Sequence, residues 1–261
     1  MLLLVSRRAS AIASLRLTQT LSAKLSRNMS SNNDLTATCR KLSEEYSACD
    51  VSDALLKLKV PQAGFLPDIV PIHGIPHGKG QHVVAPVSTV LFVPKSGENP
   101  QPSNIPTDKH WTDIPPPSSI VLLQQPAGMI CAVLGDIMAT RLKHRGVRGI
   151  VANGRIRDIA SINELCADGT LSTWSKGYST VGTGLEAKAW AVDVPVQIGG
   201  LEVRSGDILC ADENERGVVV IPQDKLDELM AILPALKATD DKCVADVQAG
   251  VDVNEVFRRH R

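Results

Sequence analysis

The run from Gly135 to Met138 has the residue types and the position of an anion-binding turn. It follows an apolar stretch that we expect to form a strand, and it opens a predicted helix over residues 136–144. In α/β folds ligands bind at the carboxyl ends of strands, and the first helical turn offers free N–H groups. The amides of Ile137 and Met138 are therefore candidates to bind a carboxylate. The alternative is that Asp136 simply caps its helix.

A second turn of the same kind carries Arg157 and Asp158. A stretch rich in β-branched residues ends near Gly154, and a predicted helix begins at Asp158. Arginine offers a planar fork to a carboxylate or oxo oxygen, and aspartate offers a hard oxygen ligand to a divalent cation. On local pattern alone the two side chains could equally form a surface ion pair. Because both turns follow consecutive parallel strands, we expect Asp136 to lie close to Arg157.

The elements that would position these turns alternate between strand and helix. We predict strands at His82–Pro94, Ser119–Leu123, Ile130–Leu134 and Gly149–Asn153, and helices at Asp136–His144 and Asp158–Ala167. This alternation favours an α/β fold with parallel strand pairing. Pro86 suggests a bulge or an edge within its strand. The long, proline-rich stretch over residues 94–118 is expected to be a functional loop or to be partly disordered.

Shorter elements flank this region. Near the start, Asp50 or Ser52 could cap a short helix. Glycine-punctuated strands that look like hairpins or a small barrel are predicted at Val194–Ile198, Leu201–Val203, Asp207–Ala211 and Gly217–Ile221, and helices at Gln223–Leu236 and Asp240–Val247. We expect one domain over residues 34–236, followed by a C-terminal helix and basic tail over residues 237–261.

The first 33 residues differ in composition from the rest. Basic residues precede the first acidic residue, Asp34, and they are Arg7, Arg8, Arg16, Lys24 and Arg27. A segment rich in Ser and Arg and poor in acid is typical of a mitochondrial presequence. The alternatives are an uninformative disordered tail and a secretory signal, but a secretory signal would need a longer apolar stretch than Ala11–Leu17, which Ser14 and Arg16 interrupt. We therefore expect the protein in the mitochondrial matrix, with a cytoplasmic form if translation starts at Met29.

Overall charge and composition exclude some partners. The chain has 28 basic and 28 acidic side chains and only 3% aromatic residues. No global field or stacking ladder would hold nucleic acid, and no segment is long and apolar enough to span a membrane. The six cysteines form no CxxC pair, which favours a reducing compartment.

The connecting text GDIMATRLKHRGVRGIVANGRIRD, with Asp136 and Arg157 21 positions apart (157 − 136), resembles the signature of the 4-hydroxy-4-methyl-2-oxoglutarate aldolases. That family shares its fold with the regulators of ribonuclease E activity. Similar fragments are CDVSDAL at residues 49–55 and VPVQIGGLEVRSGDILCADENERGVVVIP at residues 194–222. The resemblance covers most of residues 45–225. It implies a layered β/β/α domain of the swivelling type with a mostly parallel central sheet, assembled as a homotrimer with active sites between subunits.

The resemblance also implies roles for the two turns. Gly135, Asp136, Ile137 and Met138 would form the substrate-binding turn, Arg157 would bind the oxygens of a 2-oxo acid, and Asp158 would hold Mg²⁺ or Mn²⁺. An acid from a neighbouring subunit would approach the ion through water, and Asp240 or Asp241 is the nearest match. The chain departs from the family pattern where Lys176-Gly177 stands in for an Arg-Gly.

The implied chemistry is cleavage of a carbon–carbon bond beside a 2-oxo acid, which leaves an enolate. A divalent metal and a guanidinium group can stabilise its charge. Asp136 would position or deprotonate a water that takes the substrate hydroxyl proton. The same logic supports decarboxylation of oxaloacetate. The alternative, on the same fold, is a non-catalytic regulator that binds an RNA-processing enzyme. A third possibility, a phosphohistidine carrier, would need a histidine at a helix start, and none is convincingly positioned.

Several other residues have ordinary structural interpretations. His110 in the proline-rich loop is expected to be a surface residue rather than a proton carrier, and His144 to stabilise the end of its helix. A metal site formed by His73, His77 and His82 is disfavoured. Nucleotide binding at Gly182-Thr183-Gly184 is disfavoured because no strand precedes it in a dinucleotide-binding context. The acidic residues between 212 and 215 are predicted to form a solvated turn.

Overall fold

The computed structural model describes residues 34–72, 80–97, 99 and 101–261. The chain divides into two compact units, Met1–Lys41 and Leu42–Arg261. Of the first unit only residues 34–41 are described, and they are helical. The predicted presequence, residues 1–33, lies outside the described residues, so it stays a prediction. The elements that follow belong to the second unit.

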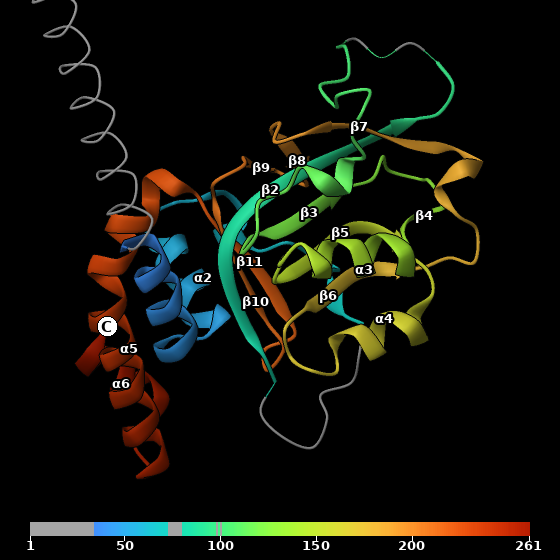
Figure 1. Cartoon of the computed structure of the whole chain (residues 1–261). Coiled ribbons are helices and arrows are strands. Elements are labelled where there is room, and N and C mark those ends of the chain that lie inside the picture. Colours follow the sequence, from blue (N-terminus) through green and yellow to red (C-terminus); the bar gives the residue numbers. More distant parts are fainter. Residues whose placement is uncertain (1–33, 73–79, 98, 100) are drawn as a thin grey trace, which may run out of the picture. The chain divides into compact units, whose positions relative to one another are not determined.

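A nine-stranded sheet forms the centre of the second unit (Figure 1). Its strand order is β1-β6-β5-β3-β2-β10-β11, with β4 paired to β5 and β7 paired to β2. The strands are β1 (Val70–Pro71), β2 (His82–Pro94), β3 (Ile120–Gln124), β4 (Ala132–Leu134), β5 (Gly149–Ile156), β6 (Ser172–Tyr178), β7 (Ala187–Val192), β10 (Ile208–Asp212) and β11 (Gly217–Ile221). The central strands β2, β3, β5 and β6 are parallel, as is β4 on β5, whereas β1, β7, β10 and β11 join antiparallel.

Helices α3 (Asp136–His144) and α4 (Ile159–Cys166) cover one face of this sheet (Figure 1). Ala139 and Leu142 of α3 and Ile162 of α4 are fully buried in a cluster with Ile150 and Ala152 of β5. Side chains alternate between the two faces of a strand, so the odd-numbered residues of this part of β5 point away from the helices. The layered α/β fold expected from the sequence is confirmed.

Strand β2 joins the parallel and antiparallel parts of the sheet. Its first residues, His82 to Pro86, pair with β10, and its pairing with β3 begins at Val87. Of the bulge or edge predicted at Pro86, the bulge is absent, because the register shift lies between Leu91 and Phe92 in the pairing with β7, whereas the side of Pro86 toward β3 is unpaired as at an edge. Pro86 occupies the last pair of the β10 ladder, where a missing N–H donor interrupts little.

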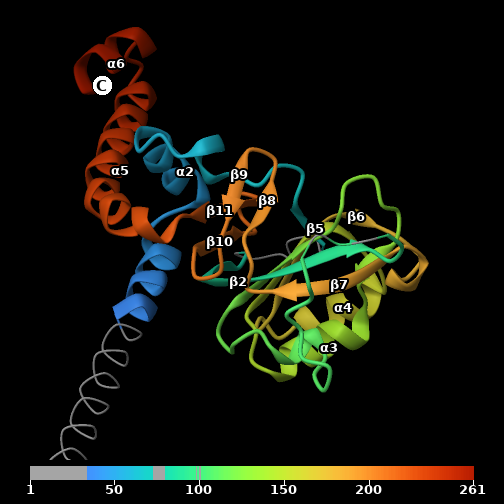
Figure 2. The ribbon, with the colours of Figure 1, turned by 90° about the horizontal axis from the view of Figure 1, so that it is seen from above.

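Helix α2 (Ala48–Lys57) packs against the β10–β11 end of the sheet, α5 (Leu226–Gln248) packs on α2, and α6 (Val253–His260) packs on α5 (Figure 2). The cap of α2 is Ser47, in a capping box with Asp50, so Ser52 and Asp50 are not the N-cap. The two predicted C-terminal helices form the single helix α5, which contains Pro234. The end predicted as a basic tail is helical in α6.

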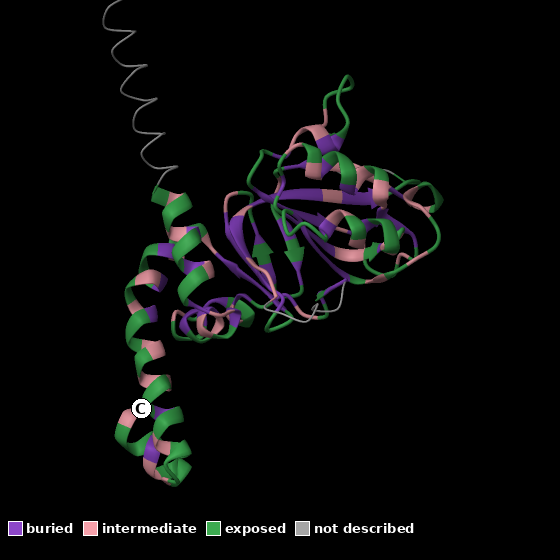
Figure 3. Ribbon diagram, turned by 60° about the horizontal axis from the view of Figure 1, so that its bottom comes forward, coloured by how far each residue is buried: buried purple, intermediate pink, exposed green. Residues whose placement is uncertain are grey.

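The remaining elements are short. Strands β8 (Val196–Ile198) and β9 (Leu201–Val203) form a hairpin, as predicted. The 3-10 helices are η1 (Pro61–Gly64), η2 (Trp111–Asp113), η3 (Thr183–Leu185) and η4 (Gln223–Lys225). Figure 3 shows that the buried residues concentrate in the sheet, whereas the C-terminal helices are largely exposed. Among the described residues, the helices lack the combination of length and apolar character that crossing a membrane requires.

Candidate functional site

The first of the two predicted turns is formed where β4 ends and α3 begins. Gly135 is the N-cap of α3, in an extended conformation and without a side-chain cap. Asp136 is the first residue of α3 and not its N-cap. Its carboxylate accepts a hydrogen bond from the N–H of Ile137 at 2.7 Å, so this amide, predicted to bind a carboxylate ligand, is already used within the turn. The N–H of Met138 has no acceptor among the described residues. The turn therefore retains a donor for an anion.

The second turn lies directly beside the first. Strands β4 and β5 pair in parallel, and the N–H of Arg157 donates to the carbonyl of Leu134 at 3.0 Å. Asp158 is the N-cap residue of α4, but its carboxylate does not cap that helix. Instead its Oδ2 accepts from the N–H of Asp136 at 3.3 Å and lies 3.3 Å from Nε of Arg157. The predicted closeness of Asp136 and Arg157 is thus present in the structure.

The backbone of Asp158 is unusual. Its φ of 61° and ψ of 40° lie in the left-handed region, which aspartate tolerates better than most residues but still at a cost. This conformation turns its carboxylate away from α4 and toward the first turn of α3. Backbone strain of this kind is often found at functional sites.

Two glycines leave room for the charged pair. A Cβ atom added to Gly135 would lie 2.6 Å from Oδ2 of Asp158, and one added to Gly182 would lie 2.8 Å from Nη1 of Arg157. Gly182 comes from the segment before η3, which a parallel bridge attaches to Ala132. Sequence reasoning considered Gly182 only for nucleotide binding. The missed signal is Gly182 itself, four residues after β6 ends at Tyr178.

Arg157 and Asp158 open into a surface pocket whose other wall is formed by Tyr178, Ser179 and Thr180. Their side chains are 42% and 34% exposed. An ion pair this exposed contributes little to the stability of the fold, so stability alone does not explain why the two side chains are held together. The surface ion pair between Arg157 and Asp158, the alternative that the sequence also allowed, is present in the structure. An anionic ligand could reach the guanidinium group, since the pocket is open to solvent.

A family model described as RraA-like, Aldolase/RraA, matches residues 48–220. The chain belongs to the RraA-like family. It is similar to Protein DlpA of Legionella pneumophila, with 24% identity over 217 residues that cover 80% of this chain and 30% of DlpA. It is also similar to an Arabidopsis thaliana protein provisionally named 4-hydroxy-4-methyl-2-oxoglutarate aldolase 3, with 32% identity over 95 residues that cover 36% of this chain and 54% of that protein. The chain thus spans about a third of the one and about half of the other.

Solved structures extend this comparison. RraAS2 of Streptomyces coelicolor, described as an unusual member of the RNase ES inhibitor RraA protein family, aligns with a TM-score of 0.61 and 25% identity over 82% of this chain and 96% of that chain. An uncharacterised Pseudomonas syringae protein aligns with a TM-score of 0.67 and 23% identity over 85% and 97%. The second likeness concerns the fold alone. The family therefore includes proteins named as aldolases and proteins named as ribonuclease inhibitors.

A divalent cation in this RraA-like site would need oxygen ligands, which the carboxylates of Asp136 and Asp158 could supply. Among the described residues, no group of three His, Cys, Asp or Glu side chains could hold a metal ion. Asp136 and Asp158 each use one oxygen in the bonds above and have a second oxygen without a hydrogen-bond partner in the part of the chain that the structure describes. Mg²⁺ is often bound by one or two carboxylates, with water and substrate oxygens completing its shell. Asp158, whose side chain is 34% exposed at the pocket, fits such a site.

The other candidate residues lie elsewhere. Asp240 and Asp241 lie on helix α5. Asp240 accepts a hydrogen bond from Arg261, and Asp241 forms a salt bridge with Lys237. Their predicted role at a neighbouring subunit's metal is not tested by these contacts. His144 is exposed in the last turn of α3, as expected.

Four further histidines have interpretations from the sequence. His110 caps η2, where its Nδ1 lies 2.8 Å from Oγ1 of Thr112. His73 and His77 lie outside the described residues. His82 lies 3.9 Å from Asp212 rather than in a metal cluster.

The prediction of a solvated acidic turn is wrong for Asp212 and Glu213, which are only 2% exposed. Asp212 accepts hydrogen bonds from the N–H of Ala48, at the start of α2, and from the N–H of Asn214. Glu213 accepts from the N–H of Gln81 and the hydroxyl of Ser172. These hydrogen bonds compensate for the free-energy cost of burying the two carboxylates, which is why both can lie in the interior.

Proposed function

We propose that the chain is a divalent-metal-dependent carbon–carbon lyase. Its substrates would be acids of the 4-hydroxy-4-methyl-2-oxoglutarate type, cleaved to pyruvate and a second 2-oxo acid, and oxaloacetate, decarboxylated to pyruvate. The observation that carries the proposal is the convergence of Arg157, Asp158 and the first turn of α3 at the ends of two paired parallel strands. Membership of a family with relatives named for this aldolase supports it.

Two groups would bind the 2-oxo acid. The guanidinium group of Arg157 would bind the oxo or carboxylate oxygen, and the free N–H of Met138 would bind the carboxylate at the helix start. When the C3–C4 bond breaks, its electron pair forms the enolate of pyruvate, and the positive charge of Arg157 would stabilise the negative charge that develops there. A Mg²⁺ or Mn²⁺ ion held by Asp158 would supply additional Lewis-acid stabilisation of that charge.

Asp136 would control proton transfer. In the retro-aldol direction the hydroxyl on C4 loses a proton, and a water positioned by the second oxygen of Asp136 would accept it. The enolate then gains a proton at carbon to give pyruvate. With oxaloacetate carbon dioxide leaves in place of the carbonyl product, so no hydroxyl proton has to be removed. Replacement of Asp136 should therefore affect aldol cleavage more than decarboxylation.

The second candidate function is non-catalytic binding to an RNA-processing enzyme. It is supported by the fold shared with RraAS2, whose name refers to the RNase ES inhibitor family. Such a protein would not need two carboxylates and a guanidinium group around one open turn. The lyase proposal accounts for those groups, so we prefer it.

A coupled assay for pyruvate tests the proposal. Oxaloacetate and 4-hydroxy-4-methyl-2-oxoglutarate are each supplied with Mg²⁺, Mn²⁺ or a chelator. We expect metal-dependent pyruvate release that falls at least about 100-fold in Arg157→Ala, the usual size of the loss of one charge-stabilising donor. Arg204→Ala is the matched control, because Arg204 is also an exposed arginine paired with a carboxylate, Glu202. Release that needs no metal, or that survives Arg157→Ala, would overturn the lyase proposal.

We further propose a homotrimer and a mitochondrial location. Light scattering coupled to size exclusion should give three times the mass of one chain, and a monomer would contradict the proposed assembly. Residues 1–33 fused to a fluorescent reporter should direct it to mitochondria. A reporter that stays in the cytosol would contradict the presequence interpretation.

A further inference from the structure

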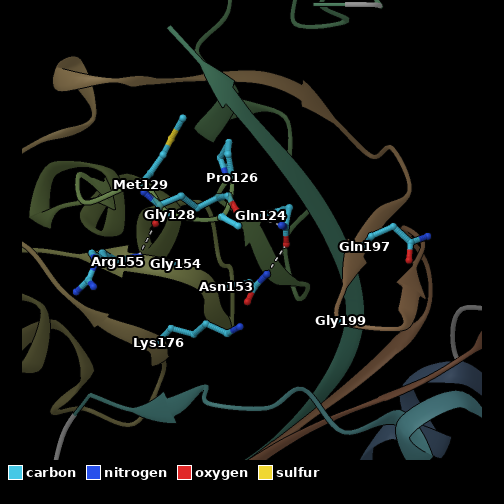
Figure 4. Close-up of a pocket in the computed structure, with 12 residues that line it drawn as sticks. Gln124, Pro126, Gly128, Met129, Asn153, Gly154, Arg155, Lys176, Gln197 and Gly199 are labelled. Atoms are coloured by element: carbon cyan, nitrogen blue, oxygen red, sulfur yellow. Dashed lines mark hydrogen bonds between the residues drawn. The ribbon is translucent and has the colours of Figure 1, made fainter.

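A second pocket opens at the carboxyl ends of β3, β5 and β6 (Figure 4). Its volume is about 430 Å³, within the range of small-molecule sites. One wall is the loop that follows β3, and another is the β8–β9 hairpin, which contributes Gln197 and Gly199. The ends of parallel strands and the mouths of barrel-like sheets are common positions for ligands. The lyase proposal makes no use of this pocket.

Three polar side chains form a row across these strands. Gln124 of β3 pairs in register with Asn153 of β5, and Lys176 of β6 follows Ser175, which pairs with Ala152. Ala152 packs in the core beneath α3 and α4, so Asn153 points to the opposite face of the sheet. The row therefore lies on the face that these two helices do not cover.

The amide of Asn153 has one satisfied end and one unsatisfied end. Its Nδ2 donates to Oε1 of Gln124 at 2.6 Å. The orientation of Gln124 is fixed in turn, because its Nε2 donates to the carbonyl of Gln125 at 3.1 Å. Oδ1 of Asn153 is buried and has no hydrogen-bond partner among the described residues. A buried acceptor without a donor is costly, so a ligand that brings a donor would be favoured here.

The charge of the pocket is positive. Its lining residues include Lys176 and Arg155 and no acidic residue. Arg155 donates to the carbonyl of Tyr178 at 3.0 Å, which orients its guanidinium group beside the pocket. Lys176 is exposed and pairs with no carboxylate in the part of the chain that the structure describes. The pocket thus offers an anion site next to an unmet acceptor.

We propose that this pocket binds a small hydroxycarboxylate. Its carboxylate would bind the ammonium group of Lys176, with Arg155 nearby, and its hydroxyl group would donate to Oδ1 of Asn153. A carboxylate alone would leave the amide oxygen without a donor, and a neutral alcohol would leave Lys176 without a counter-charge. The site would therefore recognise both groups together, and it is separate from the pocket of Arg157 and Asp158.

Calorimetric titration of the full chain tests this site. The probes are lactate and glycerate, which carry both groups, propionate, which lacks the hydroxyl, and glycerol, which lacks the carboxylate. We expect binding of the first two and binding at least about tenfold weaker for propionate and glycerol, since each lacks one charged or buried interaction. Similar affinity for lactate and propionate would overturn the proposal, as would the absence of any binding.

Variants identify the location of binding. Lys176→Met and Asn153→Leu should each weaken lactate binding about tenfold, whereas Lys57→Met, at an exposed lysine of α2, should not change it. Lys176 is exposed, so its replacement does not threaten the fold even if Asn153→Leu does. Binding should persist in Arg157→Ala, which keeps this test separate from that of the lyase activity. Loss of lactate binding in Arg157→Ala with no change in Lys176→Met would assign the ligand to the other pocket and refute the proposal.

Discussion

Asp158 and Asp136 are 22 positions apart in the chain, yet the carboxylate of the first accepts a hydrogen bond from the backbone of the second at 3.3 Å. The bond joins the starts of helices α3 and α4. It depends on the left-handed backbone of Asp158, because an N-cap residue in the usual extended conformation would direct its side chain toward its own helix. The two turns are therefore one structural unit, and substitutions in either should affect the other.

Asp158→Asn should separate charge from fold. Asparagine tolerates the left-handed region and keeps an acceptor for the N–H of Asp136, so the free energy of unfolding should change by less than about 1 kcal/mol. The lost negative charge should reduce metal-dependent pyruvate release about 100-fold, because the cation loses its carboxylate ligand. Urea unfolding and the coupled assay measure the two effects. Unchanged activity would remove Asp158 from the proposed metal site.

Gly182→Ala should displace Arg157 without changing any charge. The new Cβ atom would lie 2.8 Å from Nη1, so the guanidinium group has to move. We expect kcat/KM to fall about tenfold, since a displacement near 1 Å is enough to weaken a positioned charge. Gly184→Ala is the matched control, because no atom lies within 4 Å of its added Cβ. Equal activity of the two variants would show that the position of Arg157 is unimportant.

The strand-to-helix turns could be predicted because their signals are local. The helix Asp136–His144 has the predicted limits, since an apolar strand, a glycine and an acidic first turn mark its start. The parallel pairing of β4 and β5 then brings Asp136 and Arg157 together, as the order of elements indicated.

Strand β6 could not be predicted from local signals of this kind. In β6 the buried positions include Ser172, Thr173 and Ser175, small polar residues that do not read as an apolar strand. Burial of such residues depends on bonds from distant elements, as between Ser172 and Glu213. Because β6 was missed, so were the contributions of Tyr178 and Gly182 to the site and the polar row across β3, β5 and β6.

The cap of α2 shows the same limit at the scale of one turn. Ser47 accepts from the N–H of Asp50 at 3.2 Å, and Asp50 accepts from the N–H of Ser47 at 2.8 Å. Ser47→Ala should therefore lower the free energy of unfolding by about 1 kcal/mol. Ser52→Ala, inside the helix, should change it by no more than about 0.5 kcal/mol, because alanine has the higher helix propensity. Urea unfolding of both variants decides between the two positions, and a larger loss for Ser52→Ala would contradict the observed cap.

Cys49 should react slowly with alkylating reagents although it is exposed. Partial burial of the thiol, and next the negative charge of Glu215, raise the pKa of Cys49 from 9.0 to about 11. At pH 8 only about one thiol in a thousand is then a thiolate, against about one in ten at the ordinary pKa, and the thiolate is the reactive form. Because the folded state holds this proton more tightly, the same shift makes folding less favourable as the pH rises from 9.0 to about 11.

Glu215→Gln tests this account, since it removes the charge that faces the thiol. Sγ of Cys49 lies 3.5 Å from Oε2 of Glu215, so the variant should lower the pKa of Cys49 and increase its alkylation rate between pH 8 and 10 by about threefold or more. Iodoacetamide labelling followed by peptide mass spectrometry measures the rate at this cysteine. Glu228→Gln, an exposed carboxylate on α5 paired with Lys225, is the control and should leave the rate unchanged. If both variants label at the wild-type rate, Glu215 does not control the ionisation of Cys49.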